Sequence, residues 1–141
     1  MGTRSLTVFK EESGKEICVM YRQMDGYPKG HGLELANFLA GMKIVNGISA
    51  TEKGRTANGM PCLTAQVIKE FKGDRVGDIY IQPAGTRDCW EDYIYFVTGK
   101  EGTEPKIEVK EVIGSEKKRK EIELFSGPAT KVKKQIEKLK D

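Results

Sequence analysis

The sequence predicts a single α+β domain (residues 1–141) in which a mainly antiparallel sheet of about six strands carries about three helices on one face. Short segments that alternate polar and apolar residues are joined by short turns, which is typical of antiparallel sheets. Three other segments space their apolar residues as amphipathic helices do. The chain has 141 residues, which is long enough for one domain with its own core.

The N-terminal part predicts a strand hairpin over residues 4–22, because Gly14 lies in a polar turn between two segments rich in β-branched and aromatic residues. A loop over residues 23–32 follows it. Between the first two helices, Ile44, Val45 and Ile48 are expected to continue the helical layer. The other expected elements are strands near 77–82, 91–98, 106–113 and 119–125, helices near 33–41 and 61–72, and a C-terminal helix over 128–140.

Composition narrows the function classes. The chain has 24 basic and 21 acidic residues, and this small excess does not indicate a nucleic-acid-binding protein, although the basic run 117–120 stands out. Its three cysteines form no C-x-x-C pair, which argues against a disulfide framework or a metal site. We expect no signal peptide, no membrane span and no cofactor, and hence a cytoplasmic protein.

The loop between the first hairpin and the first helix is the densest cluster of special residues. It holds the only histidine, His31, together with Asp25 and three glycines. One interpretation pairs Asp25 with His31 for acid–base chemistry, and the other makes them a turn aspartate and a structural histidine. Gly30, His31 and Gly32 precede the helix, where free backbone N–H groups favour an anion.

Arginine and aromatic residues suggest a second kind of site. Tyr21, Arg22, Tyr27, Arg87 and Trp90 would line one pocket for a flat anionic ligand, because arginine binds phosphate and aromatic rings stack on bases. The alternative places the tyrosines in the core and pairs the arginines with acidic neighbours. The full set of candidate ligand-binding residues is Arg4, Tyr21, Arg22, Gln23, Asp25, Gly26, Tyr27, Gly30, His31, Gly32, Arg87 and Trp90.

Two motifs carry a resemblance. Gly-Thr-Arg-Ser-Leu-Thr at 2–7 and Tyr-Arg-Gln-Met-Asp-Gly-Tyr-Pro-Lys-Gly-His-Gly at 21–32 resemble a family of short proteins that are frequent in phages and prophages. Relatives often carry tryptophan where Met24 stands here. The resemblance implies an accessory protein that modifies, blocks or sequesters host components. One class of such proteins forms oligomers that bind cyclic or ADP-ribose-like immune nucleotides without cleaving them.

The predicted function is therefore binding of an anionic, nucleotide-like molecule without turnover, in the host cytoplasm if a phage encodes the protein. Arg4, Arg22 and Arg87 would hold phosphate, and Tyr27 and Trp90 would stack. A homo-oligomer is compatible with this prediction. One alternative is a small hydrolase or nuclease that uses the Asp25/His31 pair. Another is a protein–protein inhibitor of a host factor.

Overall fold

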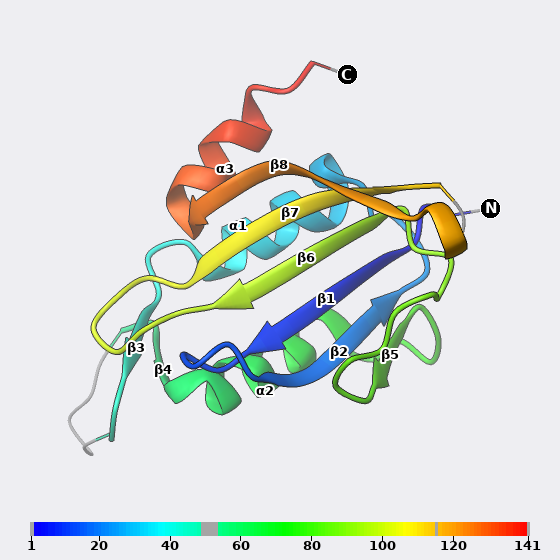
Figure 1. Ribbon diagram of the computed structural model, residues 1–141. Helices are drawn as coiled ribbons and strands as arrows, with labels where there is room; N and C mark the ends of the chain where they lie inside the picture. The colour runs from blue at the N-terminus through cyan, green and yellow to red at the C-terminus, as the bar shows by residue number, and fades with distance from the viewer. Residues whose placement is uncertain (1, 49–53, 115, 141) are drawn as a thin grey trace.

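The computed structural model describes residues 2–48, 54–114 and 116–140, and its fold is α+β as predicted. The main sheet has the strand order β5-β2-β1-β6-β7-β8 (Figure 1). Neighbouring strands are antiparallel except β1 and β6, which run parallel. The strands of this sheet are β1 (Ser5–Lys10), β2 (Glu16–Arg22), β5 (Ile79–Gln82), β6 (Tyr93–Thr98), β7 (Lys106–Ile113) and β8 (Lys120–Pro128).

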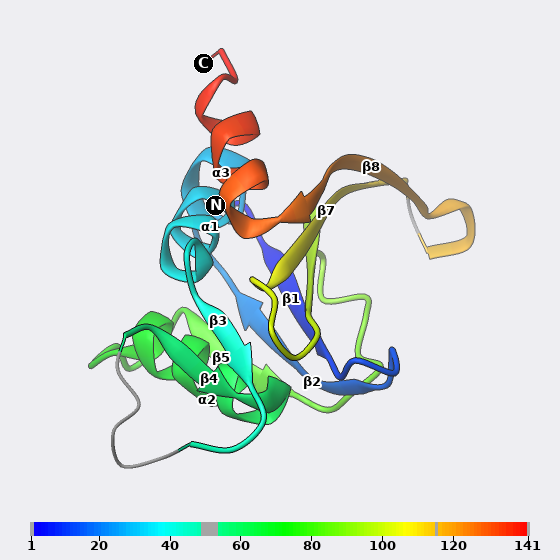
Figure 2. The ribbon, with the colours of Figure 1, turned by 90° about the vertical axis from the view of Figure 1, so that its left-hand side faces the viewer.

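The helices lie on one face of this sheet, as Figures 1 and 2 show. They are α1 (Leu33–Leu39), α2 (Gly59–Lys72) and α3 (Ala129–Glu137). Their apolar stripes and the inward side chains of the strands form the main core. Each helix contributes buried residues to it, such as Leu35 of α1, Leu63 of α2 and Ile136 of α3. A π-helical turn (Pro28–Gly32) leads into α1, and a 3₁₀ turn (Glu116–Lys118) joins β7 to β8.

The opposite face of the sheet carries no helix among the described residues and has a smaller apolar cluster. Leu6, Val8, Val19, Ile94 and Phe96 form this cluster, and we call this side the open face. The segment that connects β5 to β6, residues 83–92, covers part of it, since Cys89 packs against the cluster.

The region between α1 and α2 corrects one expectation. Ile44 and Val45 do not continue the helical layer: they belong to β3 (Lys43–Val45), which pairs in parallel with β4 (Thr56–Asn58). Gly41 and Gly47 flank β3 with positive φ, and such backbone ends a helix. Ile44 is buried as a strand residue, whereas Ile48 is exposed.

Several element boundaries also shift. The helix expected at 61–72 begins at Gly59, and the strand expected at 119–125 continues to Pro128, so that α3 begins one residue later than expected and ends at Glu137. In the three described segments of the chain, no helix is both long and apolar enough to cross a membrane.

Candidate functional site

Two of the predicted site residues, Arg22 and His31, form a polar cluster between the sheet and the helices. The side chain of Arg22 is only 4% exposed, and its Nη1 donates to Glu34 Oε2 at 2.8 Å and to His31 Nδ1 at 3.1 Å. His31 is fully buried, with its ring packed edge-on against Phe71 and Tyr95. These contacts tie the end of β2 to α1 and α2.

The hydrogen bonds of His31 define its tautomer. A guanidinium can only donate, so Nδ1 of His31 must accept from Arg22. The proton therefore resides on Nε2, which donates to Thr7 Oγ1 at 2.7 Å. Burial, together with the positive charge of Arg22, lowers the pKa of His31 from 6.5 to about 3. The imidazole is neutral at physiological pH, and both nitrogens are occupied within the core.

This lowered pKa predicts a specific acid sensitivity. Below a pH of about 6.5 the unfolded chain binds a proton at His31 that the folded protein excludes, so the free energy of unfolding falls as the pH falls, by up to about 1.4 kcal/mol per pH unit, and levels off above that pH. Urea denaturation between pH 7 and pH 5 would measure this slope. His31 is the only histidine, so the variant His31→Gln should show a clearly flatter profile in this range. Equal slopes for the two proteins would contradict the prediction.

The backbone N–H groups of the turn before α1 donate to carbonyl groups of the same loop. The N–H groups of Gly30 and Gly32 donate to the carbonyl of Tyr27 at 2.9 and 3.5 Å, and that of His31 donates to the carbonyl of Asp25 at 2.7 Å. The three amides that the expected anion site would use are therefore already bonded to backbone carbonyls. The short helix α1 begins with these amides already paired.

Asp25 and His31 meet through the backbone only, among the interactions that the described residues form. The carboxylate of Asp25 accepts a long hydrogen bond from the hydroxyl of Tyr27, at 3.5 Å, and faces solvent. The two ring nitrogens of His31 form their hydrogen bonds with Thr7 and Arg22 instead. This geometry is that of a structural histidine beside a turn aspartate, so it does not favour the acid–base interpretation.

The other predicted residues divide between the two faces of the sheet. Arg22 points toward the helices, whereas its neighbour Tyr21 points to the open face, where its hydroxyl accepts from Arg4 Nε at 3.0 Å. Successive residues of a strand alternate between faces, so these two side chains cannot line one pocket. Gln23 contributes its backbone N–H, which donates to Asp78.

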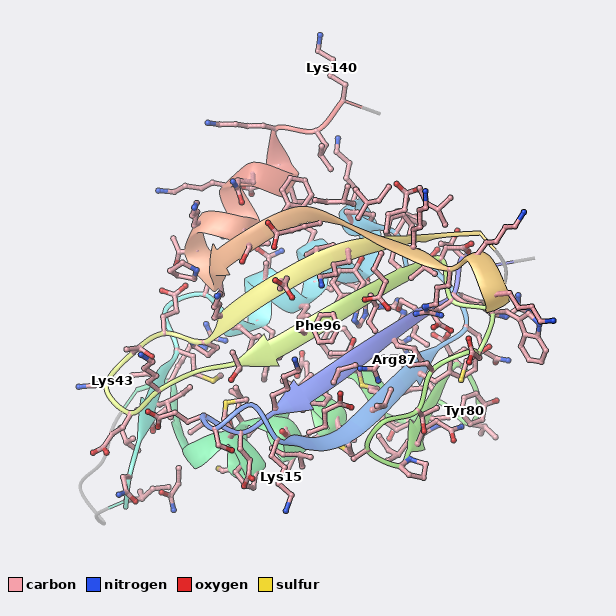
Figure 3. The ribbon with its side chains drawn as sticks, in the orientation of Figure 1. Lys15, Lys43, Tyr80, Arg87, Phe96 and Lys140 are labelled. Atoms are coloured by element: carbon pink, nitrogen blue, oxygen red, sulfur yellow. The ribbon has the colours of Figure 1, made fainter. Side chains whose placement is uncertain are left out.

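Arg87 also has a structural partner. It lies on the open face near Phe96 (Figure 3), with its Cζ 5.8 Å from the centre of that ring. Its Nη2 donates to Glu16 Oε2 at 2.8 Å, and this interaction lowers the pKa of the Glu16 carboxyl. Together with the N–H of Gly85, Arg87 thus anchors the first part of the segment 83–92, before the loop that carries Trp90, to the start of β2.

A cleft lies at the far end of that segment and is a second candidate site. It has a volume of about 670 Å³, within the range of small-molecule sites, and lies between the loop before β6 and the turn between β7 and β8. Trp90 projects from the loop with 81% of its surface exposed. The charged and aromatic residues that line the cleft are Asp88, Trp90, Glu91, Lys117, Lys118 and Arg119.

Some charged side chains of the cleft form ion pairs and others do not. Arg119 pairs with Glu91 at 2.7 Å and with Glu121 at 3.2 Å. Lys117 and Lys118 are exposed, and within the described segments neither forms an ion pair. The cleft therefore offers an exposed indole together with two ammonium groups that lack a carboxylate partner there.

Trp90 is among the candidate ligand-binding residues predicted from the sequence, whereas its basic neighbours are not. Lys117 and Lys118 belong to the run 117–120, whose charge was visible in the sequence but had no assigned role. The strand order places this run beside Trp90, because β7 pairs with β6 and the turn after β7 reaches the loop before β6. The signal was the basic run itself, and the missing information was the pairing of β6 with β7.

Comparisons with known proteins give no further guidance: no protein-family model, curated protein or solved structure matches this chain.

Proposed function

We propose that this protein binds a flat, anionic small molecule of nucleotide type in the cleft beside Trp90, without chemical turnover. The observation that carries the proposal is the exposed indole of Trp90 next to Lys117 and Lys118 in a cleft of about 670 Å³. An aromatic ring stacks on a base at a gain of about 1–3 kcal/mol, and ammonium groups attract phosphate. Asp25 and His31, the pair that catalysis would require, do not line this cleft, which favours binding over catalysis.

The backbone of Trp90 supports a functional role for its exposure. Its φ is +60°, a conformation that is unfavourable for a bulky residue and costs roughly 1–3 kcal/mol. The indole gains little burial in return, because it is mostly exposed. A ligand that covers the ring would provide that burial.

The resemblance of the N-terminal motifs to phage and prophage proteins supplies a context for this proposal. In that context the protein is an accessory protein that sequesters a nucleotide-like signal of host defence in the host cytoplasm. The proposal differs from the prediction made from sequence in where the ligand lies. Trp90 keeps its stacking role, and Lys117 and Lys118 take the phosphate-binding role that the prediction gave to Arg4, Arg22 and Arg87.

The single tryptophan makes the test direct, because fluorescence excited at the red edge of the indole absorption, where the five tyrosines do not absorb, reports on Trp90 alone. Titration with mononucleotides, cyclic dinucleotides and ADP-ribose should give saturable quenching with at least one compound. The double variant Lys117→Gln/Lys118→Gln should bind that compound about 10-fold or more weakly, since each charge-assisted hydrogen bond contributes about 1.5–3 kcal/mol. Mass spectrometry of the recovered ligand should show it unchanged.

The matched control is the double variant Lys138→Gln/Lys140→Gln, which removes the same charge beyond the end of α3, where Lys140 projects into solvent (Figure 3). It should bind like the natural protein. No quenching by any compound, or equal affinity of both double variants, would contradict the proposal. Consumption of the ligand would instead support the hydrolase or nuclease alternative. The protein–protein inhibitor and the homo-oligomer stay predictions, and light scattering would check the second.

A further inference from the structure

Glu91 lies beneath the loop that presents Trp90. Its side chain is fully buried, and its two oxygens accept hydrogen bonds from the loop backbone: Oε1 from the N–H of Cys89 at 2.7 Å and Oε2 from the N–H of Asp88 at 3.3 Å. A buried carboxylate is costly unless a cation and hydrogen bonds accompany it. Here both are present, so the carboxylate fixes the backbone that surrounds it.

Arg119 supplies the cation and connects the two walls of the cleft. Its Nη1 lies 2.7 Å from Glu91 Oε2 and 3.5 Å from Asp88 Oδ1 on the loop side. Its Nε lies 3.2 Å from Glu121 Oε2 on β8. Burial lowers the pKa of Arg119, but its hydrogen bonds to Glu91 and Glu121 outweigh burial and raise it, so the guanidinium keeps its charge.

The loop needs such a support, because its backbone is unfavourable. Asp88 and Trp90 both have φ of +60°, on either side of Cys89. Packing of the indole cannot hold this conformation, since the ring is mostly exposed. The hydrogen bonds of Glu91 to this loop and the ion pair of Asp88 with Arg119 are polar contacts that can maintain it.

We propose that the Glu91–Arg119 ion pair positions Trp90, holding the indole opposite Lys117 and Lys118. Glu91 and Arg119 act here as positioning residues that work through the loop backbone. The consequence for ligand affinity rests on the proposed function, whereas the positioning itself does not depend on any ligand.

Time-resolved fluorescence anisotropy of Trp90 in the ligand-free protein tests this positioning. In Arg119→Met and Glu91→Gln the amplitude of the fast local motion should rise about twofold or more, because the loop gains freedom on the nanosecond timescale. Arg119→Lys keeps the charge but lacks the planar guanidinium that contacts Glu91 and Glu121 at the same time. The amplitude of the fast motion in this variant should therefore lie between those of the natural protein and Arg119→Met. Far-UV circular dichroism and the melting temperature establish that each variant is folded.

The matched control is Arg87→Met, which removes another ion pair of 2.8 Å from the same connecting segment. It should leave the local motion of Trp90 unchanged. Unchanged motion in the folded Arg119 and Glu91 variants, or an equal increase in Arg87→Met, would overturn the inference. If Arg119→Met does not fold, Arg119→Lys decides the question by the same readout.

Ligand titration separates this inference from the proposed function. If Trp90 gains motion in the variants while no compound binds the natural protein, the positioning holds and the proposed function fails. If a compound binds the natural protein but Trp90 keeps its rigidity in the variants, the proposed function holds and the positioning fails. If both hold, affinity should fall in Glu91→Gln and Arg119→Lys and stay constant in Arg87→Met.

Discussion

Replacing Arg22 by methionine is expected to lower the free energy of unfolding by about 3 kcal/mol. Methionine keeps much of the apolar volume near Phe71 but removes the guanidinium. His31 Nδ1 then remains buried without a donor, at a cost of about 1–3 kcal/mol, and the contact between β2 and Glu34 of α1 is lost. For a chain of this length we expect a fall in melting temperature of about 10 °C.

Urea denaturation followed by circular dichroism measures this loss. The control Glu34→Gln should lower the free energy of unfolding by less than about 1 kcal/mol. The side chain of Glu34 is half exposed, and the hydrogen bond between Arg22 and His31 remains in this variant. In a double-mutant cycle, Arg22→Met with His31→Leu should cost clearly less than the sum of the two single variants, since the buried acceptor is removed with its donor. Additive costs would contradict a coupled pair.

The same variant separates the two candidate sites. At temperatures where Arg22→Met is folded, we expect it to bind the nucleotide-like ligand with unchanged affinity. Arg22 contacts Glu34 and Phe71 on the helix side, whereas the cleft adjoins the open face through Val112. If the variant retained its stability and lost binding, this result would indicate that the ligand binds at the loop before α1.

Replacing Gly26 by alanine is the second substitution with a large expected effect. A Cβ on Gly26 would lie 2.8 Å from the carbonyl oxygen of Thr3, 2.8 Å from Cβ of Ser5 and 2.9 Å from the carbonyl carbon of Arg4. Two of these are backbone atoms, and the segment they belong to leads into β1 near the middle of the sheet. Relief would require the loop or the strand to move, at a cost of about 3 kcal/mol.

Two hydrogen bonds make that movement harder. The N–H of Gly26 donates to the carbonyl of Thr3 at 2.9 Å, and its carbonyl accepts from the hydroxyl of Tyr95 at 2.7 Å. The control Gly14→Ala has no neighbouring atom within 4 Å of the added Cβ and should cost only about 1 kcal/mol, for its φ of +94°. Thermal and urea unfolding compare the two, and similar losses would contradict the steric explanation.

Much of the fold could be predicted from local patterns. Alternation and short turns identified the β1–β2 hairpin and the strands near 106–113 and 119–125, and the amphipathic spacing of 61–72 identified α2. The parallel pair of β1 and β6 could not be predicted in this way, because its partners lie far apart in the chain and no turn connects them. The short strands β3 and β4 were missed because each has only three residues.

The candidate site was harder to predict for the same reason. The sequence marked Trp90 and the basic run separately, but only the order of β6, β7 and β8 places them in one cleft. The loop at 21–32 stood out for its histidine and glycines, and the structure gives most of them packing roles. The alternation rule could have separated Tyr21 from Arg22 in advance, since neighbours in a strand face opposite sides.

The position of β1 in the sheet has a consequence for synthesis of the protein. The first strand lies between β2 and β6, and Ser5 pairs with Tyr93, so the middle of the sheet closes only after most of the chain has left the ribosome. Until then, the nascent β1–β2 hairpin exposes the edge of β1 that later receives β6, and exposed strand edges are prone to pair with other chains. Slow translation before β6 should therefore increase aggregation, whereas the same delay after it should not.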